Sequence, residues 1–217
     1  MFASPRTVSE VMTQTVVALG RDATFKLIVE TMEQWKVSAL PVLEGEHRVV
    51  GVVSEADLLP KEEFRDSDPT TYDEVRRLSD IAKAGAVTAG DLMTSPAVCV
   101  HADATVAQAA RIMAERRVKR LPVTDAEGAL CGIVSRCDLL KVFLRTDREI
   151  ADEVRREVVR PLFPGEPSVT VAVDDGVVTL GGQVLEPALI RVASRLARAV
   201  EGVVDVHSEL AAPASAP

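Results

Sequence analysis

Hydrophobic and polar positions follow one another in the same order twice along the chain. Residues 8–59 and 89–140 align without a gap, and Met12 corresponds to Met93, a shift of 93 − 12 = 81 positions. So many identities in one register indicate an internal duplication. The same shift relates three further groups: Asp22-Ala23-Thr24 to Asp103-Ala104-Thr105, Leu40-Pro41-Val42 to Leu121-Pro122-Val123, and Asp57-Leu58-Leu59 to Asp138-Leu139-Leu140.

Each copy predicts a short helical start that ends at a Met-Thr pair, followed by the order β-α-β-β-α. In the second copy the long helix begins at Thr105, where Gln108 completes a capping-box pattern. The proline of each Leu-Pro-Val group suits the start or the edge of a strand. One copy alone is too small to bury a core, so we expect the two to pack together. The predicted strands are 16–18, 40–42 and 49–53, and in the second copy 97–100, 121–123 and 130–134.

The remaining sequence predicts a connection between the copies and a further small domain. In the connection, an apolar stripe of Tyr72, Val75, Leu78 and Ile81 favours a helix, with a long solvated linker as the alternative. From residue 145 the pattern predicts the order α-β-β-α-β. Its elements are a helix stopped by Pro161 and Pro164-Gly165, strands at 169–173 and 177–180 around the turn 174–176, a helix over 187–199 and a last strand that 202–206 leads into.

These patterns predict an α+β fold with five segments. The two β-α-β-β-α repeats pack as a pseudo-twofold pair, and the α-β-β-α-β domain follows them. The expected boundaries are repeat 1 at 1–60, a connecting segment at 61–87, repeat 2 at 88–144, the small domain at 145–210 and a disordered tail at 211–217.

The corner that closes each copy carries the polar groups of interest. A Gly-apolar-apolar strand ends at Ser54 or Ser135, and a carboxylate follows three residues later, at Asp57 or Asp138. A helix start offers free backbone N–H groups to an anion, and a carboxylate can accept hydrogen bonds from the vicinal hydroxyls of a ribose. The alternative is that each serine only caps its helix.

Composition narrows the function classes. The chain of 217 residues is 47% hydrophobic and 27% charged, as in globular proteins, and its 3% of aromatic residues predicts aliphatic cores. The net charge of −8 argues against nucleic-acid binding. There is neither a signal-peptide pattern nor a long apolar run, so we expect a cytoplasmic protein and consider membrane binding unfavourable.

The cysteines, histidines and remaining polar residues do not form the pattern of a catalytic or metal site. Cys99, Cys131 and Cys137 lack metal or disulfide spacing, which indicates reduced thiols that fill space. The three histidines are far apart, so no metal site is expected. Because no base accompanies the Ser-x-x-Asp corners and no phosphate-binding glycine loop is present, we expect no enzyme activity and no required cofactor.

The duplicated unit resembles the CBS domain, in its Met-Thr start, its Leu-Pro-Val strand and its closing Gly-apolar-apolar-Ser-x-x-Asp. The C-terminal unit resembles the BON domain, in 173–182 and in Gly202-Val203-Val204-x-Val206. The CBS resemblance implies a disc with two clefts that bind adenine nucleotides or related adenosyl ligands. The Asp would hold the ribose, the Ser would face the phosphate, and the other residues would wall the adenine. By position these roles fall on Ser135, Asp138, Ala97, Val98, Arg120, Leu121 and Pro122, and on Ser54, Asp57, Val16, Val17, Ala39, Leu40 and Pro41.

The two copies differ in charge beside these corners. Arg136 follows Ser135, whereas Glu55 follows Ser54, and an anion is attracted by the first and repelled by the second. A basic cluster of Arg116, Arg117, Lys119 and Arg120 occurs only in the second copy. We therefore expect the cleft with Asp138 to be the stronger phosphate site. For Arg116 and Arg117 the alternative is a cationic helix end.

The leading hypothesis is a regulatory protein that binds AMP, ATP or S-adenosylmethionine. It would be a homodimer through the CBS pair and would relay ligand binding to the BON unit or to an unknown protein partner. One alternative is a structural or stress-associated dimer with vestigial clefts. Another is an adaptor that binds a membrane or a partner through the BON unit.

Overall fold

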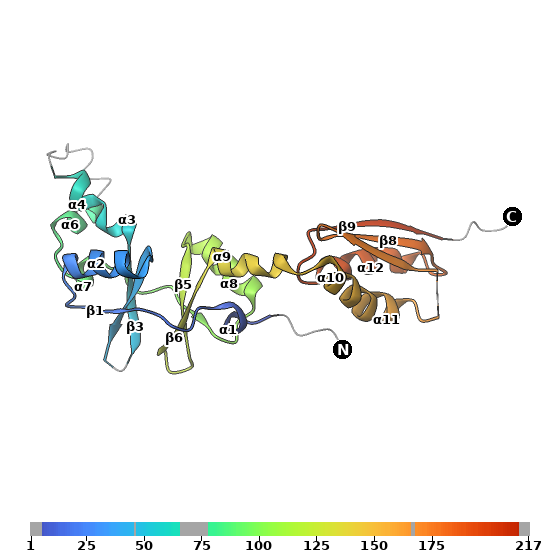
Figure 1. Cartoon of the computed structure of the whole chain (residues 1–217), viewed down its shortest axis with the longest axis horizontal. Coiled ribbons are helices and arrows are strands. Elements are labelled where there is room, and N and C mark those ends of the chain that lie inside the picture. Colours follow the sequence, from blue (N-terminus) through green and yellow to red (C-terminus); the bar gives the residue numbers. More distant parts are fainter. Residues whose placement is uncertain (1–5, 46, 66–77, 166–167, 213–217) are drawn as a thin grey trace. The chain divides into compact units, whose positions relative to one another are not determined.

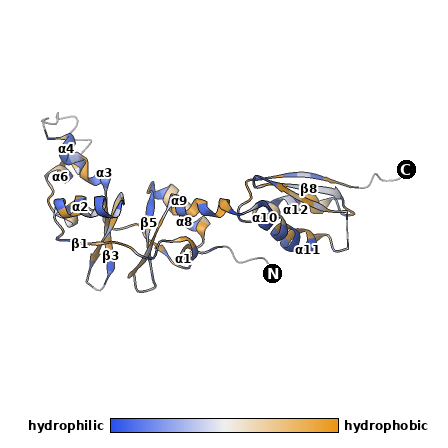
Figure 2. Cartoon of the chain, viewed as in Figure 1, coloured by the Kyte–Doolittle hydropathy of each residue, from blue (hydrophilic) through white to orange (hydrophobic). Residues whose placement is uncertain are grey.

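The computed structural model describes residues 6–45, 47–65, 78–165 and 168–212 (Figure 1). It divides into two compact units, Thr7–Arg136, and Cys137–Pro217 with Met1–Arg6. Figure 2 shows hydrophobic and hydrophilic residues interleaved along the elements of both units, as the sequence pattern requires.

The first unit contains two three-stranded sheets of identical topology, which confirms the duplication. In each sheet a two-residue strand pairs in parallel with the middle strand, and the third strand pairs with the middle strand in an antiparallel manner. The strands are β1 (Leu19–Gly20), β2 (Ala39–Glu44) and β3 (Arg48–Ser54), then β4 (Val100–His101), β5 (Arg120–Thr124) and β6 (Leu130–Ser135).

Helices surround these sheets in the predicted places. They are α1 (Val8–Val11), α2 (Phe25–Trp35), α3 (Glu55–Leu58), α4 (Pro60–Glu63), α6 (Leu78–Gly85), α7 (Ala89–Leu92) and α8 (Val106–Arg116); α9 (Arg136–Leu140) begins at the last residue of this unit and belongs otherwise to the second. The predicted capping box at the start of α8 is confirmed. The Gln108 N–H donates to Thr105 Oγ1 at 3.2 Å, and the Thr105 N–H donates to Gln108 Oε1 at 2.8 Å.

The two copies exchange their short N-terminal segments. Thr13 pairs with Ile133, so the segment after α1 lies along β6 of the second copy. In the same way Thr94 pairs with Val52, so the segment after α7 lies along β3 of the first copy. Each copy therefore completes the sheet region of the other.

A close contact between methionine and glycine accompanies each exchange. A Cβ atom on Gly51 would overlap the side chain of Met93, and one on Gly132 would overlap the side chain of Met12. Only glycine leaves room for these methionines, which gives the repeated Met and Gly positions a common physical cause.

The hydrophobic core of the first copy also depends on the exchange. Ala89 and Leu92 of α7 are fully buried against residues of β2, β3 and α2, namely Leu40, Val42, Val53, Ile28 and Met32. The expectation that neither copy buries a core by itself therefore agrees with the packing.

Two predicted strands differ in the structure. Residues 16–18 and 97–99 are not strands, and β1 and β4 begin only at Leu19 and Val100. Pro41 lies in the middle strand of its sheet, although a strand start or edge was predicted. It is tolerated because β1 pairs with β2 only from Val42 onward, so the Pro41 nitrogen faces no partner strand there.

The connecting segment is described only in part. The described residues do not include Asp68-Pro69-Thr70, where the sequence predicts a turn and the start of this helix, nor Tyr72 and Val75. Helix α6 covers the other two residues of the predicted apolar stripe, Leu78 and Ile81. This helix is held to the first copy by two lysines. Lys83 forms an ion pair with Asp57, and Lys61 Nζ donates to the Ala84 carbonyl at 2.9 Å.

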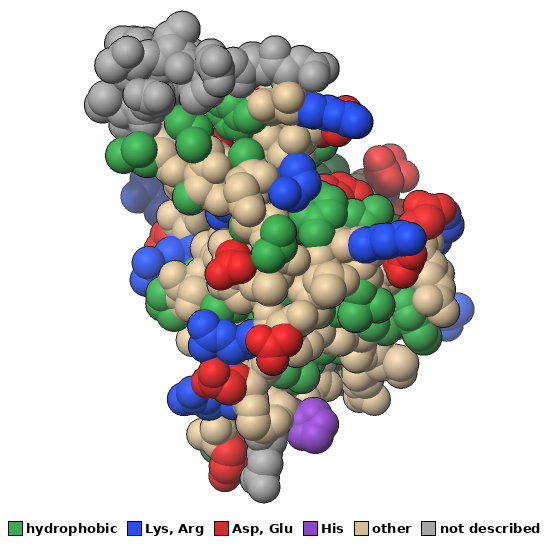
Figure 3. Space-filling model, turned by 90° about the vertical axis from the view of Figure 1, so that its left-hand side faces the viewer, with side chains coloured by type: hydrophobic (Ala, Val, Ile, Leu, Met, Phe, Trp, Pro, Cys, Tyr) green, Lys and Arg blue, Asp and Glu red, His purple; other side chains and the backbone are tan. Residues whose placement is uncertain are grey.

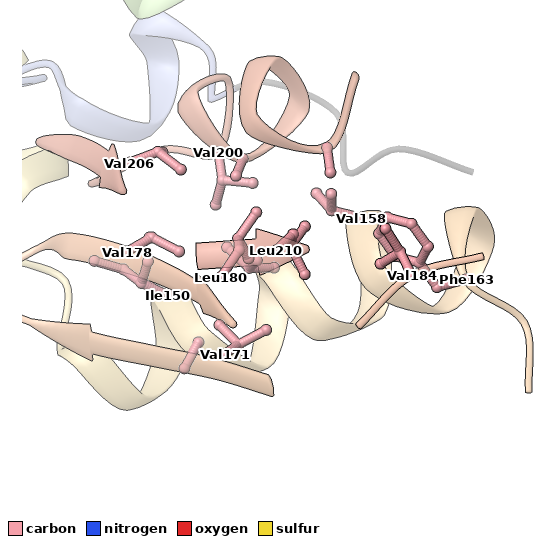
Figure 4. Packing of buried hydrophobic residues seen from close by; sticks show 14 residues of the cluster. Ile150, Val158, Phe163, Val171, Val178, Leu180, Val184, Val200, Val206 and Leu210 are labelled. Carbon is pink, nitrogen blue, oxygen red and sulfur yellow. The ribbon is translucent and has the colours of Figure 1, made fainter. Parts of the chain in front are cut away.

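The second unit has the predicted order α-β-β-α-β. It contains η1 (Lys141–Leu144), α10 (Asp147–Val154), the π-helical η2 (Arg155–Val159), α11 (Arg160–Leu162), β7 (Thr170–Asp174), β8 (Val177–Gln183), α12 (Ala188–Arg198) and β9 (Asp205–Ala211). The strand order is β7-β8-β9. Aliphatic side chains of the helices and of one sheet face form its core, including Ile150, Val178 and Leu180 (Figure 4).

Three boundaries of this unit differ from the prediction. The helix passes Pro161, the first predicted stop, after a π turn, and it ends at Leu162, just before the second, Pro164-Gly165. β8 continues through Gly181 and Gly182, where Gly182 has φ +115°. β9 extends to Ala211, the first residue of the predicted tail, and residues 213–217 lie outside the described part.

Replacing Gly51 by alanine should destabilise the first unit by about 1–3 kcal/mol, because overpacking forces Met93 and its backbone to move. The overlap includes Met93 Cβ, so rotation of the methionine tail alone cannot relieve it. Urea unfolding should show the loss. Gly20→Ala is the matched control, since an added Cβ meets nothing within 4 Å there. Equal stability of the two variants would contradict the packing argument.

Replacing Asp147 by alanine should loosen the β7–β8 hairpin. The Asp147 carboxylate accepts the backbone N–H of Asp175 at 3.0 Å and of Gly176 at 2.8 Å. Losing both acceptors should destabilise the second unit by about 1–3 kcal/mol. The amides of Asp175 and Gly176 should exchange faster with deuterium, while exposed Arg148→Ala leaves them unchanged. Unchanged exchange in the Asp147 variant would rule out this role.

Candidate functional site

A pocket of about 270 Å³ lies in the first unit where β3 ends and α3 begins. Three stretches of chain from both copies line it. They contribute Ser38, Ala39, Val52, Ser54, Glu55 and Ala56 from the first copy, then Thr94, Ala97 and Val98, and finally Arg117, Val118, Lys119 and Arg120 from the second.

The exchanged segment explains why residues from both copies meet here. The backbone N–H of Thr94 donates to the Val52 carbonyl at 2.9 Å, and the Val52 N–H donates to the Thr94 carbonyl at 3.1 Å. Ala97 and Val98 follow in the same segment and line the pocket together with Ser54 at the end of β3. Because these residues line a pocket rather than pair with a strand, the predicted strand at 97–100 starts three residues late.

The polar corner of the first copy is a capping box. Both the backbone N–H and the hydroxyl of Ser54 donate to Asp57 Oδ2, each at 2.7 Å. The other carboxylate oxygen of Asp57 forms the ion pair with Lys83. Asp57 is 8% exposed and does not belong to the described lining of the pocket. In this copy the carboxylate therefore fixes the corner and the connecting helix, and Ser54 alone of the pair faces the pocket.

Cationic side chains from the second copy give the pocket its charge. Arg117, Lys119 and Arg120 line it together with one acid, Glu55. Arg120 is half-buried, and its Nη2 donates to Ser38 Oγ at 2.7 Å, which fixes the guanidinium between the two copies. Arg117 ends α8 in a left-handed conformation, with φ 54°.

This arrangement differs from the grouping expected from the sequence. The sequence argument placed Ala97, Val98 and the basic cluster with Ser135 and Asp138. In the structure Ala97, Val98 and Arg120 share a pocket with Ser54 instead. Ala97 and Val98 lie beside Ser54 because the N-terminal segment of each copy packs on the other copy. Aligning the two copies in sequence does not reveal this exchange. The pocket therefore combines the Glu55 corner with three members of the basic cluster.

The other predicted site residues are placed as follows. Leu40 and Leu121 are fully buried, and Pro41 and Pro122 are buried beside them, so these four belong to the interior rather than to the described pocket lining. Val16 and Val17 are half-buried, in the segment that begins where Thr13 pairs with Ile133. Thr13 pairs with Ile133 in the same antiparallel manner in which Thr94 pairs with Val52, so Val16 and Val17 hold the position in the first copy that Ala97 and Val98 hold in the second.

Two residues of the second corner have other contacts. The Arg136 guanidinium donates to the Val118 carbonyl at 3.1 Å, at the end of the loop that follows α8. Asp138 belongs to the second unit, where Lys141 Nζ donates to its Oδ1 at 2.7 Å. Lysine thus pairs with the closing carboxylate in both copies, a feature that the sequence prediction did not include.

A second, wider groove of about 490 Å³ adjoins the pocket. Ser38, Glu55 and Arg120 line both, so the Arg120–Ser38 hydrogen bond lies at their common border. The groove is otherwise formed by α2 and α3, with apolar Val29 and Leu58 among its residues. Figure 3 shows the end of this unit, where acidic, basic and apolar side chains are interspersed.

Among the described residues there is no group of three or more Cys, His, Asp or Glu side chains that could hold a metal ion. The helices in that part of the chain are all too short or too polar to span a bilayer.

Comparison with known proteins agrees with this architecture. The CBS domain model matches residues 8–61 and 89–145, and the BON domain model matches 146–213. The chain belongs to the CBS-domain family. Its CBS pair is followed by a BON domain, as the sequence motifs predicted.

Proteins of known sequence and solved structures both resemble the CBS pair of this chain. The chloroplast protein CBSX2 of Arabidopsis thaliana is 35% identical over 134 residues, which are 56% of this chain and 56% of that protein. The chain thus spans about half the length of this relative. Hypoxic response protein 1 of Mycobacterium tuberculosis is 26% identical over 62% of this chain and 83% of its own length. Among solved structures, CBSX2 in complex with AMP matches with a TM-score of 0.56 and 33% identity, covering 64% of this chain and 96% of that one.

The three thiols should differ in reactivity. Burial raises the pKa of the Cys99 thiol, and burial together with Asp125 raises that of Cys131, whereas Cys137 is exposed. A raised pKa leaves less thiolate at neutral pH. We expect iodoacetamide at pH 7.5 to modify exposed Cys137 faster than Cys99, because Cys99 is less accessible and holds less thiolate. Peptide mass spectrometry would measure this, and similar rates at all three would contradict it.

Proposed function

We propose that this CBS–BON protein is a regulatory protein, not an enzyme, and that it binds an adenine nucleotide in the pocket at the end of β3. Ser54 and the cations Arg117, Lys119 and Arg120 would bind the phosphate. Ala97, Val98 and Val52 would contact the adenine. The arrangement of three cations around a pocket with an apolar wall is the observation that carries the proposal.

The chemistry of the pocket favours this ligand class. Phosphate oxygens bind arginine through charge-assisted hydrogen bonds, which are stronger than neutral ones. Arg120 is already oriented by Ser38, so less side-chain freedom is lost on binding. The crystal structure of the 33% identical CBSX2 contains AMP, which supports an adenine nucleotide as the ligand.

Calorimetric titration with AMP, ATP and S-adenosylmethionine tests the proposal directly. We expect measurable binding of at least one of the three, and a rise in melting temperature with the same ligand. Absence of both heat and melting shift for all three would overturn it. That result would favour the alternative of a dimer with vestigial clefts, for which the Asp57–Lys83 ion pair offers a purely structural role.

Replacing Arg120 by alanine should weaken nucleotide binding about tenfold or more, since a hydrogen bond to a charged group contributes about 1.5–3 kcal/mol. Arg116→Ala is the matched control, because Arg116 is exposed on α8 and does not line the pocket. Glu55→Gln should strengthen binding of AMP several-fold by removing a like charge. Equal affinities of the Arg116 and Arg120 variants would exclude Arg120 as a phosphate ligand.

By analogy with the first copy, the corner at Ser135, together with Val16 and Val17, is proposed as a second site of the same kind. The relay of binding to the BON domain or to a protein partner is also part of the proposal. It requires the ligand to have different affinities for two states of the protein.

Exposed apolar residues on α2, such as Val29 and Trp35, support a homodimer through the CBS pair, which sedimentation of the free protein would detect.

A further inference from the structure

The sheet of the second unit is covered by helices on one face only. Val171, Val178, Leu180 and Val206 point toward α10 and α12 and are buried in the core (Figure 4). Since side chains alternate along a strand, the residues between them face the other side. The strand register places three rows on this open face, Asp174–Val177–Asp205, Ala172–Thr179–His207 and Thr170–Gly181–Glu209.

This open face is acidic. Most of its side chains are small or branched at Cβ, and β7, β8 and β9 contain no lysine or arginine. Its acids are Asp174, Asp205 and Glu209, and within the described chain neither Asp174 nor Glu209 has an ion-pair partner. The N–H of Val206, and then Arg198, hold the pKa of Asp205 below its usual range, so this carboxyl is charged at neutral pH.

The outer side of helix α12 carries a basic stripe. Helix α12 contains three arginines and no acidic residue, and Ala193 and Ala197 are buried on its inner side. Arg191, Arg195 and Arg198 are exposed and recur at spacings of four and three residues, so they share one face of the helix. In the described part of the chain Arg191 and Arg195 form no ion pair, and Arg198 contacts Asp205 at 3.6 Å in an exposed pair.

The acids of the neighbouring helix α10 are already engaged within the chain. Asp147 binds the hairpin backbone, Glu149 caps α10 through Thr146, Asp152 pairs with Arg155, and Glu153 pairs with Arg145. The acids of the open sheet face are therefore the better match for the α12 arginines.

We propose that the α12 stripe of one chain docks on the open sheet face of a second chain. An α-helix rises about 1.5 Å per residue and a strand about 3.3 Å, so Arg191 to Arg198 span about 10 Å and Asp205 to Glu209 about 13 Å. Arginine side chains are long enough to absorb this difference. Because the two surfaces are made of different residues, the contact is head-to-tail and can add further chains. It does not depend on the nucleotide pocket.

Sedimentation velocity of the full chain over a range of concentrations tests the proposal. At about 50 mM salt we expect association that weakens about tenfold or more at about 500 mM, where exposed charges are screened. Arg195→Glu alone and Glu209→Arg alone should each weaken it about tenfold. The double variant, in which the charges are exchanged, should restore it to near the level of the unchanged protein. Arg148→Glu, at an exposed position of α10, is the matched control and should associate normally.

Three outcomes would overturn this docking mode. The first is identical sedimentation of Arg195→Glu and the unchanged chain at low salt. The second is failure of the double variant to recover while the single variants remain folded by circular dichroism. The third is binding of anionic phospholipid vesicles through Arg195 without self-association. A dimer through the CBS pair would persist equally in all variants, so it does not obscure the result.

Discussion

The contact between a methionine of one copy and a glycine of the other organises the first unit. Met12 lies over Gly132, and Met93 lies over Gly51, and in both places a Cβ atom would overlap the methionine. The neighbouring threonines extend the strands of the opposite copy, and α7 supplies buried residues to the first core. The first core and the pocket both rest on this exchange, because neither is complete in one copy.

The pocket is a direct result of the same exchange. The segment that reaches β3 carries Ala97 and Val98, and the loop after α8 carries the cations that meet Ser54 from the other side. A ligand here would contact both copies at once, so its binding energy would favour the packed pair. The hydrogen bond between Arg120 and Ser38 already joins the copies at this point.

Much of the fold could be predicted because its determinants are local or repeated. The duplication, the helix caps and the order of the BON domain follow from spacing that is visible in the sequence. The residues that line the pocket could not be predicted. An alignment of the two copies shows that Glu55 and Arg136 hold equivalent positions, but it does not show which segments lie side by side in the fold. The ion pair between Asp57 and Lys83 was missed for the same reason, since it joins residues 26 positions apart through the fold. The sequence correctly placed the prolines in strands. It did not predict that β1 is only two residues long, which is why Pro41 can lie in the middle strand of its sheet.

The reciprocal exchange has a consequence for how such a chain arose. A chain with a single copy presents one methionine segment and one glycine strand, and it can satisfy both only by pairing with another molecule. Two such chains would form a symmetric dimer with the same contacts that the two copies make here. Joining them through the connecting segment replaced a concentration-dependent encounter by an intramolecular one, with an effective concentration on the order of millimolar. Tethering also freed the two halves to diverge, so that one could gain arginines and the other a glutamate at a pocket they share.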